Sequence, residues 1–308
     1  MTSSAYTEKS TTDRTATTLP LGDSNIGIRS ARIPFWVRWA GWSALQLFRR
    51  VPKRRSLSET ERKLRDTATV ADLPAAGHRI RLYQWGDAGP TTLLVHGWGG
   101  GATQFEAVVH RLIASGHRVV AFDLPGHGQS TGSFTDLGQM AQVIAAVVRL
   151  VGPVDAVVAH SLGATATGIA LADGLQVGRV ALLAAAAEPH VFFGMFARWL
   201  RLPKAVQAEA QRLIHERVGR PFAELTLECT LPSDLDALLL VHDRGDRRAP
   251  YAPIAGVAAQ RPKTRLLSTE GLGHRRILED DTVVDAVASF ATGLHSLGDT
   301  GQPILQPA

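Results

Sequence analysis

The sequence predicts an α/β protein built on a mostly parallel, eight-stranded sheet that is flanked by helices. From about residue 68 onward, apolar β-branched runs alternate with helical patterns, which is typical of parallel strands joined by crossover helices. An apolar fraction of 45% in 308 residues is sufficient for a large core. The segment 188–233 shows helical patterns without a strand. We interpret this segment as a small helical cap inserted above the sheet.

Composition limits the cellular setting and the partners. Residues 1–30 lack a basic start and an apolar run, so they predict a disordered tail and no secretory signal. The single cysteine, Cys229, excludes an intramolecular disulfide, and we expect a cytoplasmic location. The net charge of +5 arises mainly between residues 29 and 66. Because no binding motif accompanies this charge, we expect no nucleic-acid partner.

Residues 31–66 form a basic, aromatic-rich segment with an expected helix over 33–50, where Pro34 suits the first turn. Such a helix reaches only about 26 Å and contains Arg38, so it does not suit a transmembrane span. Two alternatives stay open: packing wholly within the protein, or peripheral contact of residues 33–55 with anionic lipid. At 100° per residue, the packing side is expected to hold Trp36, Val37, Ala40, Ala44, Leu47 and Phe48, and the opposite side Phe35, Trp39 and Trp42.

The predicted core has a first part over 67–187 and a second part over 234–295, and a flexible tail follows over 296–308. Pro74 to Gly77 supply a hairpin turn between the first two strands, and the helices that follow are long enough for crossover connections. Strands are expected at 68–73, 78–85, 93–95, 118–122, 154–159, 179–184, 237–242 and 265–268. Helices are expected at 103–114, 136–151, 162–172, 251–259 and 282–294.

The strand over 154–159 runs directly into a helix through Ala159-His160-Ser161-Leu162-Gly163. This pattern is typical of a nucleophile elbow, a strained turn that needs small residues on either side of the serine. The helix directs free backbone N–H groups toward Ser161, and the N–H of Leu162 is the first candidate oxyanion donor. Taken alone, the motif also fits a serine that only caps a buried helix.

A glycine-rich loop, His96-Gly97-Trp98-Gly99-Gly100, follows an earlier strand. The N–H of Trp98 is our candidate for the second oxyanion donor. A dinucleotide-binding turn is an alternative, because Gly97, Gly99 and Ala102 match its pattern and Asp123 lies at a suitable distance for a ribose. That alternative leaves the elbow unexplained.

The His96-Gly97 loop, the run Asp-x-Pro-Gly-x-Gly-x-Ser at 123–130 and the elbow together resemble the α/β-hydrolase superfamily over residues 68–295. The resemblance implies the α/β-hydrolase fold and a triad in the order nucleophile, acid, histidine. It implies Asp246 as the acid, with Asp243 as second choice because it stands where the family has a glycine. His274, after a glycine-rich loop beyond the last strand, matches the base. The resemblance implies a structural role for Asp123.

These residues predict a serine hydrolase that cleaves a carboxylic ester or thioester through an acyl enzyme, as carboxylesterases, lipases and thioesterases do. An apolar stripe in the predicted cap supplies the candidate pocket residues Phe192, Phe196 and Trp199, and the same stripe also fits packing of the cap against the sheet. No cofactor or metal is expected. A non-catalytic receptor or scaffold on the same fold is the alternative from another class.

Overall fold

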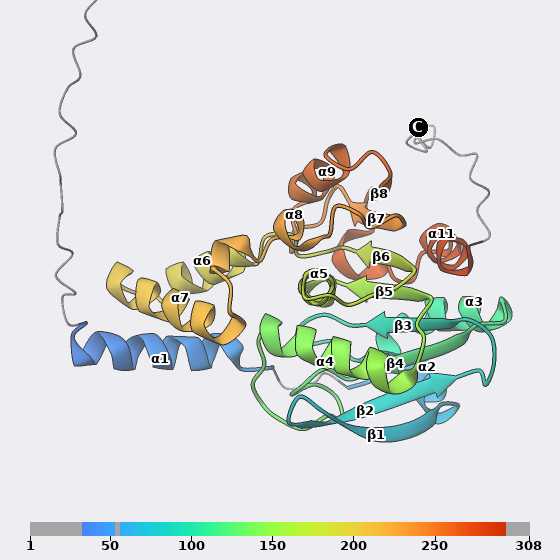
Figure 1. Ribbon diagram of the computed structural model, residues 1–308, viewed down its shortest axis with the longest axis horizontal. Coiled ribbons are helices and arrows are strands. Elements are labelled where there is room, and N and C mark those ends of the chain that lie inside the picture. Colours follow the sequence, from blue (N-terminus) through green and yellow to red (C-terminus); the bar gives the residue numbers. More distant parts are fainter. Residues whose placement is uncertain (1–32, 53–55, 294–308) are drawn as a thin grey trace, which may run out of the picture. The chain divides into compact units, whose positions relative to one another are not determined.

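The computed structural model describes residues 33–52 and 56–293, and its eight strands form one sheet (Figure 1). The strand order is β1-β2-β4-β3-β5-β6-β7-β8; β2 pairs antiparallel with β1 and β4, and the other pairs are parallel. The expected mostly parallel architecture is therefore confirmed. The strands are β1 (Thr69–Ala75), β2 (His78–Trp85), β3 (Thr91–Val95), β4 (Arg118–Phe122), β5 (Ala156–His160), β6 (Arg179–Leu183), β7 (Leu238–Asp243) and β8 (Arg265–Thr269).

Helices cover both faces of this sheet, because side chains alternate between two buried clusters along each parallel strand. Leu93 and Val95 of β3 pack in one cluster with α4 and α5, whereas Leu94 packs in the other with α3 and α11. The helices around the sheet are α2 (Glu59–Asp66), η1 (Ala102–Phe105), α3 (Glu106–Ala114), α4 (Leu137–Val151), α5 (Leu162–Ala172), α9 (Tyr251–Ala259), α10 (Gly273–Arg276) and α11 (Asp281–Thr292).

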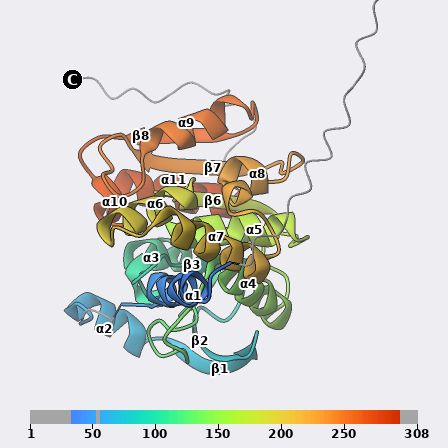
Figure 2. The ribbon, with the colours of Figure 1, turned by 90° about the vertical axis from the view of Figure 1, so that its left-hand side faces the viewer.

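Helices α6 and α7 of the cap segment and the N-terminal helix α1 lie together beyond one end of the strands, where Figure 2 shows α1 beside α7. Gly41 of α1 makes this close packing possible, because a Cβ atom there would lie 2.5 Å from Cγ of Glu209 in α7. Phe48 of α1 contacts Phe193 and Phe196 of α6, with ring centroids 5.3 and 5.2 Å apart. The elements are α1 (Phe35–Arg49), α6 (Pro189–Trp199), α7 (Lys204–Val218), η2 (Phe222–Glu224) and α8 (Leu227–Thr230).

The expected packing side of α1 is only partly correct. Val37, Ala44 and Phe48 face the protein as predicted, but Trp36 and Leu47 are 58% and 46% exposed. The buried side is centred on Gly41 and Leu45 instead, because α7 approaches α1 at the glycine. Among the described residues, none of the helices is both long and apolar enough to cross a bilayer.

Most predicted elements are found within two residues of their expected ends. The helix expected over 103–114 divides into η1 and α3, and neither α2 nor α10 was predicted as a separate helix. A capping box at Ser58 and Glu61, which a sequence can show, begins α2. The tails over 1–30 and 296–308, and residues 53–55 of the proposed membrane segment, lie outside the described residues.

Candidate active site

Ser161 lies at the turn between β5 and α5, in a backbone conformation that residues other than glycine rarely adopt. Its φ is 57° and its ψ is −126°, and strain of this kind is concentrated at functional turns. A Cβ on Gly97 would lie 2.7 Å from Cβ of Ser161, and one on Gly163 would lie 2.3 Å from the carbonyl oxygen of His96. Both glycines are therefore required for the glycine-rich loop to approach the elbow.

The structure joins Ser161, His274 and Asp246 in one chain of hydrogen bonds. Nδ1–H of His274 donates to Oδ2 of Asp246 at 2.7 Å. This bond leaves Nε2 of His274 as an acceptor, 2.9 Å from the hydroxyl oxygen of Ser161. A hydroxyl, an imidazole and a carboxylate from the ends of three parallel strands thus meet at one edge of the sheet.

Asp246 is buried and held as a carboxylate. Its Oδ1 accepts the backbone N–H groups of Arg248 at 2.7 Å and Ala249 at 3.0 Å. Burial opposes ionisation, but the hydrogen bonds from His274 and from these N–H groups outweigh it and keep the pKa of Asp246 below its ordinary value. A charged Asp246 can orient the imidazole and stabilise its cationic form.

Asp243, the alternative acid, is fully buried and makes no bond to the imidazole of His274. Its carboxylate accepts from the N–H of Leu272, the hydroxyl of Thr269 and the N–H of Gly245. Burial again opposes ionisation, and these donors lower the pKa of Asp243 in spite of it. The position of Asp243 suits an anchor for the loop that carries His274.

Two backbone N–H groups beside Ser161 are available to a ligand. The N–H of Leu162 begins α5, and the N–H of Trp98 lies in the loop after β3. Within the residues that the structure describes, neither group donates a hydrogen bond to the protein. Both are therefore suitable donors for a developing oxyanion.

Two buried histidines support this arrangement, and the sequence had given neither a role. Nε2–H of His160 donates to the carbonyl oxygen of His274 at 2.9 Å. Nε2 of His127 accepts the N–H of Gly99 at 3.0 Å, beside Trp98. Burial, together with the nearby His274 and His96 respectively, lowers the pKa of His160 and of His127 to about 3.

The buried histidines predict acid lability. Between pH 6.5 and about 3, the unfolded chain binds protons that folded His127 and His160 exclude. The stabilising contribution of these two neutral histidines is therefore fully present above pH 6.5. As the pH decreases toward 3, the free energy of unfolding falls by about 1.4 kcal/mol per pH unit for each histidine. The stabilising contributions of Asp243 and Asp246 are still present near pH 5, because their lowered pKa values place the loss of these contributions mainly below 3.8.

Urea unfolding at about pH 7.5 and pH 5 measures this effect. The wild-type chain is expected to lose stability at the lower pH, and His160→Gln is expected to lose less. Equal stability of the wild type at the two pH values would contradict the neutral state of these histidines.

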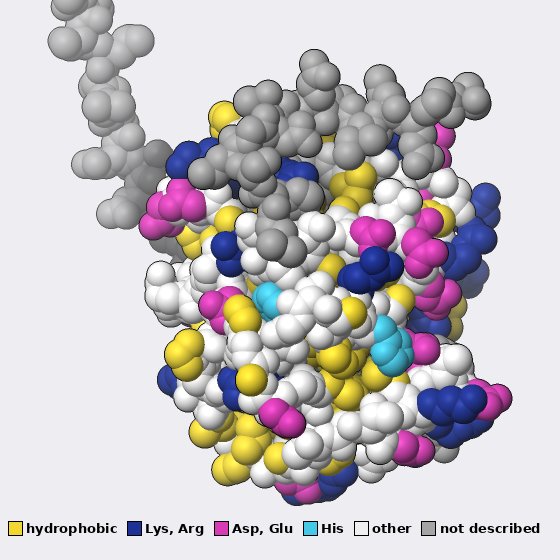
Figure 3. Space-filling model, turned by 90° about the vertical axis from the view of Figure 1, so that its right-hand side faces the viewer, with side chains coloured by type: hydrophobic (Ala, Val, Ile, Leu, Met, Phe, Trp, Pro, Cys, Tyr) yellow, Lys and Arg dark blue, Asp and Glu magenta, His cyan; other side chains and the backbone are white. Residues whose placement is uncertain are grey.

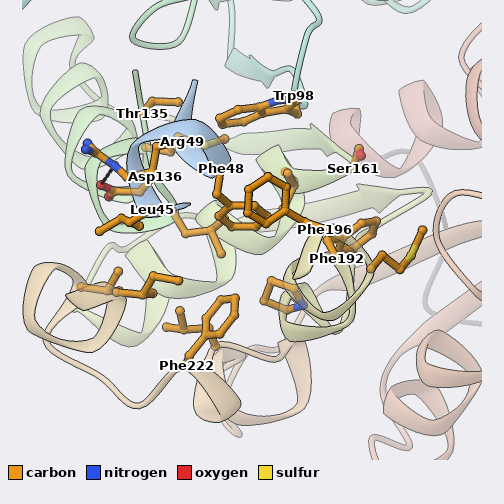
Figure 4. Close-up of a pocket in the computed structure, with 18 of the residues that line it drawn as sticks. Leu45, Phe48, Arg49, Trp98, Thr135, Asp136, Ser161, Phe192, Phe196 and Phe222 are labelled. Carbon is orange, nitrogen blue, oxygen red and sulfur yellow. Dashed lines mark hydrogen bonds and ion pairs between the residues drawn. The ribbon is translucent and has the colours of Figure 1, made fainter. Parts of the chain in front are cut away.

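A cavity of about 520 Å³ contains Ser161, Trp98 and His274 in its wall. Its apolar part comes from α1 as well as from the cap: Phe48, Phe192, Phe196 and Phe222 line it (Figure 4). The sequence predicts Phe192 and Phe196 for this pocket but not Phe48. Phe48 lies far from the cap in the chain, so no local sequence pattern connects it with the pocket.

The prediction of Trp199 as a pocket residue is corrected, because Trp199 lies outside this cavity and is 76% exposed. The buried side of α6 consists of Pro189, Phe193 and Ala197. The predicted stripe lies at the edge of that side, so its first turns reach the cavity while Trp199, in the last turn, points away.

Asp123 is buried in the turn after β4 and cannot contact a ribose. Its carboxylate accepts from the N–H groups of Ala102 and Gln129 and from the hydroxyl of Tyr83. These bonds remove the basis for a dinucleotide site. Among the described residues, the structure has no cluster of three His, Cys, Asp or Glu side chains suited to a metal ion.

Comparison with known proteins identifies the family. The sequence profile of the Alpha/beta hydrolase family matches residues 92–287. The chain belongs to the alpha/beta hydrolase family, and the expected class of enzyme is confirmed.

The chain is 28% identical to the pimeloyl-[acyl-carrier protein] methyl ester esterase of Xanthomonas campestris pv. campestris, over 67% of this chain and 96% of that protein. Among solved structures, it is similar to a membrane phospholipase A (TM-score 0.56, 18% identity, 83% of this chain and 93% of that one). It is also similar to Est1E of Butyrivibrio proteoclasticus with bound ferulic acid (TM-score 0.55, 18% identity, 73% and 97%). At these identities the structural matches show the fold alone.

Proposed function

We propose that this hydrolase cleaves a carboxylic ester or thioester with Ser161 as nucleophile, His274 as base and Asp246 as the orienting acid. The observation that carries the proposal is the hydrogen-bonded chain from Asp246 through His274 to Ser161. The similarity to a methyl ester esterase supports ester cleavage over other hydrolytic reactions.

In the proposed reaction, His274 accepts the proton of Ser161 while the hydroxyl oxygen attacks the acyl carbon. The negative charge of the tetrahedral intermediate is stabilised by the N–H groups of Trp98 and Leu162. His274 then gives its proton to the leaving group, and an acyl enzyme forms. Water, activated by His274, hydrolyses the acyl enzyme and restores Ser161.

The cavity is the proposed acyl pocket, and Phe196 tests this role. Phe196→Ala is expected to lower kcat/KM for long-chain esters about tenfold more than for short-chain esters, because a long chain loses an aromatic contact. p-Nitrophenyl esters and acyl-CoA thioesters of graded chain length provide the measurement.

Trp199→Ala is the matched control, because it removes an exposed aromatic residue from the same helix and is expected to leave the chain-length preference unchanged. Equal losses on short and long substrates in Phe196→Ala would assign that residue to packing alone. A lack of turnover on every ester and thioester would overturn the proposed activity.

Peripheral membrane contact through α1 is the second part of the proposal. Phe35, Trp36, Trp39 and Trp42 are exposed on this helix, from 54% for Trp42 to 83% for Phe35, and Arg38 is exposed beside them. By contrast, charged side chains are scattered over the face in Figure 3, at the end away from α1. Exposed tryptophans beside arginine suit the interface of an anionic bilayer.

Vesicle flotation tests this contact. Because α1 also lines the cavity, substitution is more informative than deletion of the helix. The wild-type chain is expected to float at low salt with vesicles that contain phosphatidylglycerol, and Trp39→Ser/Trp42→Ser is expected to lose most of this binding. The control is Leu150→Ser, which changes an exposed apolar residue at the end of α4. Equal recovery of all three proteins would rule out the membrane role of α1.

A further inference from the structure

A charged cluster lies in the wall of the mostly apolar cavity, away from Ser161 (Figure 4) and distinct from Arg247 and Arg248, which also line it. It combines Arg49 at the end of α1, Asp136 at the start of α4 and Arg217 in the last turn of α7. Nε of Arg49 donates to Oδ2 of Asp136 at 2.9 Å, and Nε of Arg217 donates to the same oxygen at 3.0 Å. One carboxylate oxygen therefore accepts hydrogen bonds from two guanidinium groups.

Among the described residues, the two guanidinium groups and one carboxylate of the cluster give it a net positive charge. Oδ1 of Asp136 caps α4 by accepting the N–H of Gln139. Both oxygens of this carboxylate therefore already accept hydrogen bonds, and its single negative charge is shared by two arginines. Arg49 is only 7% exposed, and burial together with the charge of Arg217 lowers the pKa of its guanidinium. The positive end of the α4 dipole adds to the potential. The excess charge is carried by Arg217, which lines the cavity and whose side chain is 43% exposed, so an anion that enters the cavity can reach it.

Thr135 supplies an independent indication of a ligand. It is fully buried and lines the cavity next to Asp136. Its N–H donates to the carbonyl oxygen of Arg49, but its hydroxyl has no hydrogen-bond partner among the described residues. Buried hydroxyl groups are normally bonded, so one without a partner in a cavity wall points to a partner that the described residues do not supply.

We propose that Arg49, Arg217 and Thr135 bind an anionic group, a carboxylate or a phosphate, that the substrate itself carries at a distance from its ester. The inference rests on the proposed function, since the ester lies at Ser161 and the apolar chain runs past Phe48 between the two ends. The substrate class is then an ester or thioester whose acyl part ends in a negative charge.

A purely structural role explains only part of this cluster. The pair of Arg49 and Asp136 fastens the end of α1 to the start of α4, and the backbone bonds at Val51 and Thr135 do the same. This role requires neither the second guanidinium on Asp136 nor the unpartnered hydroxyl of Thr135. An anion site accounts for both.

Binding to the full-length Ser161→Ala chain tests the inference without turnover. Isothermal titration compares methyl esters of equal chain length that end in a methyl, a carboxylate or a phosphate group. An anionic ester is expected to bind about tenfold or more tightly than the neutral one, the effect of one hydrogen bond to a charged group. The better of the two anionic esters identifies the natural group.

Arg217→Gln, added to Ser161→Ala, is expected to remove most of this preference, and Thr135→Val is expected to reduce it. The matched control is Arg220→Gln, because Arg220 pairs with Asp173 outside the cavity and its loss is expected to preserve the preference. Equal affinity for neutral and anionic esters, or a preference that survives Arg217→Gln, would overturn the inference. Hydrolysis of neutral esters by the wild-type chain tests the catalytic proposal separately, so the two failures are distinguishable.

Discussion

Replacing Ser161 by alanine is expected to lower kcat for ester hydrolysis by at least about 10⁴-fold, because no other group takes the place of the attacking oxygen. The free energy of unfolding is expected to stay close to the wild-type value, since the hydroxyl hydrogen-bonds only with His274 among the described residues and leaves little space when removed. Steady-state kinetics and urea unfolding of the purified variant measure the two quantities. Retention of wild-type turnover in a folded Ser161→Ala protein would remove Ser161 from the mechanism.

Replacing Asp246 by asparagine is expected to lower kcat by about 10⁴-fold, because the amide favours the imidazole tautomer that cannot accept the proton of Ser161. The hydrogen bonds from Arg248 and Ala249 can persist to the amide oxygen, so the fold is expected to be kept. The measurement is kcat across a range of pH.

Asp243→Asn is the matched variant, because both carboxylates are buried at the end of β7. It loses at least one of three hydrogen bonds, at a cost of about 1–3 kcal/mol in the free energy of unfolding, while kcat falls much less than in Asp246→Asn. The reverse order of the two effects on kcat would assign the acid role to Asp243.

The sequence predicted the parts of the site whose signals are local. The elbow requires a strand, a serine between small residues and a helix, all within a few positions, so Ser161 and Leu162 could be proposed without a structure. The choice between Asp243 and Asp246 depended on resemblance, because both follow the same strand. Only the path of the loop to His274 shows which carboxylate contacts the imidazole.

Features that depend on the packing of distant segments could not be predicted. The rotation of α6 decides that Phe196 lines the cavity while Trp199 is exposed, and helical spacing alone does not fix that rotation. The contribution of α1 to the cavity has the same origin. Gly41 sets how closely α1 approaches α7, and so places Phe48 beside Phe193.

Labelling with a fluorophosphonate probe tests the central claim, that Ser161 is an activated nucleophile, most directly. The probe phosphonylates a serine whose hydroxyl gives its proton to an adjacent base as it attacks phosphorus, and fluoride leaves. The account predicts one labelled peptide in the native protein, with the label on Ser161, and slower labelling in Asp246→Asn. Equal labelling of native wild-type and Ser161→Ala proteins, or a native Ser161 that stays unlabelled, would contradict it and favour a non-catalytic member of the family.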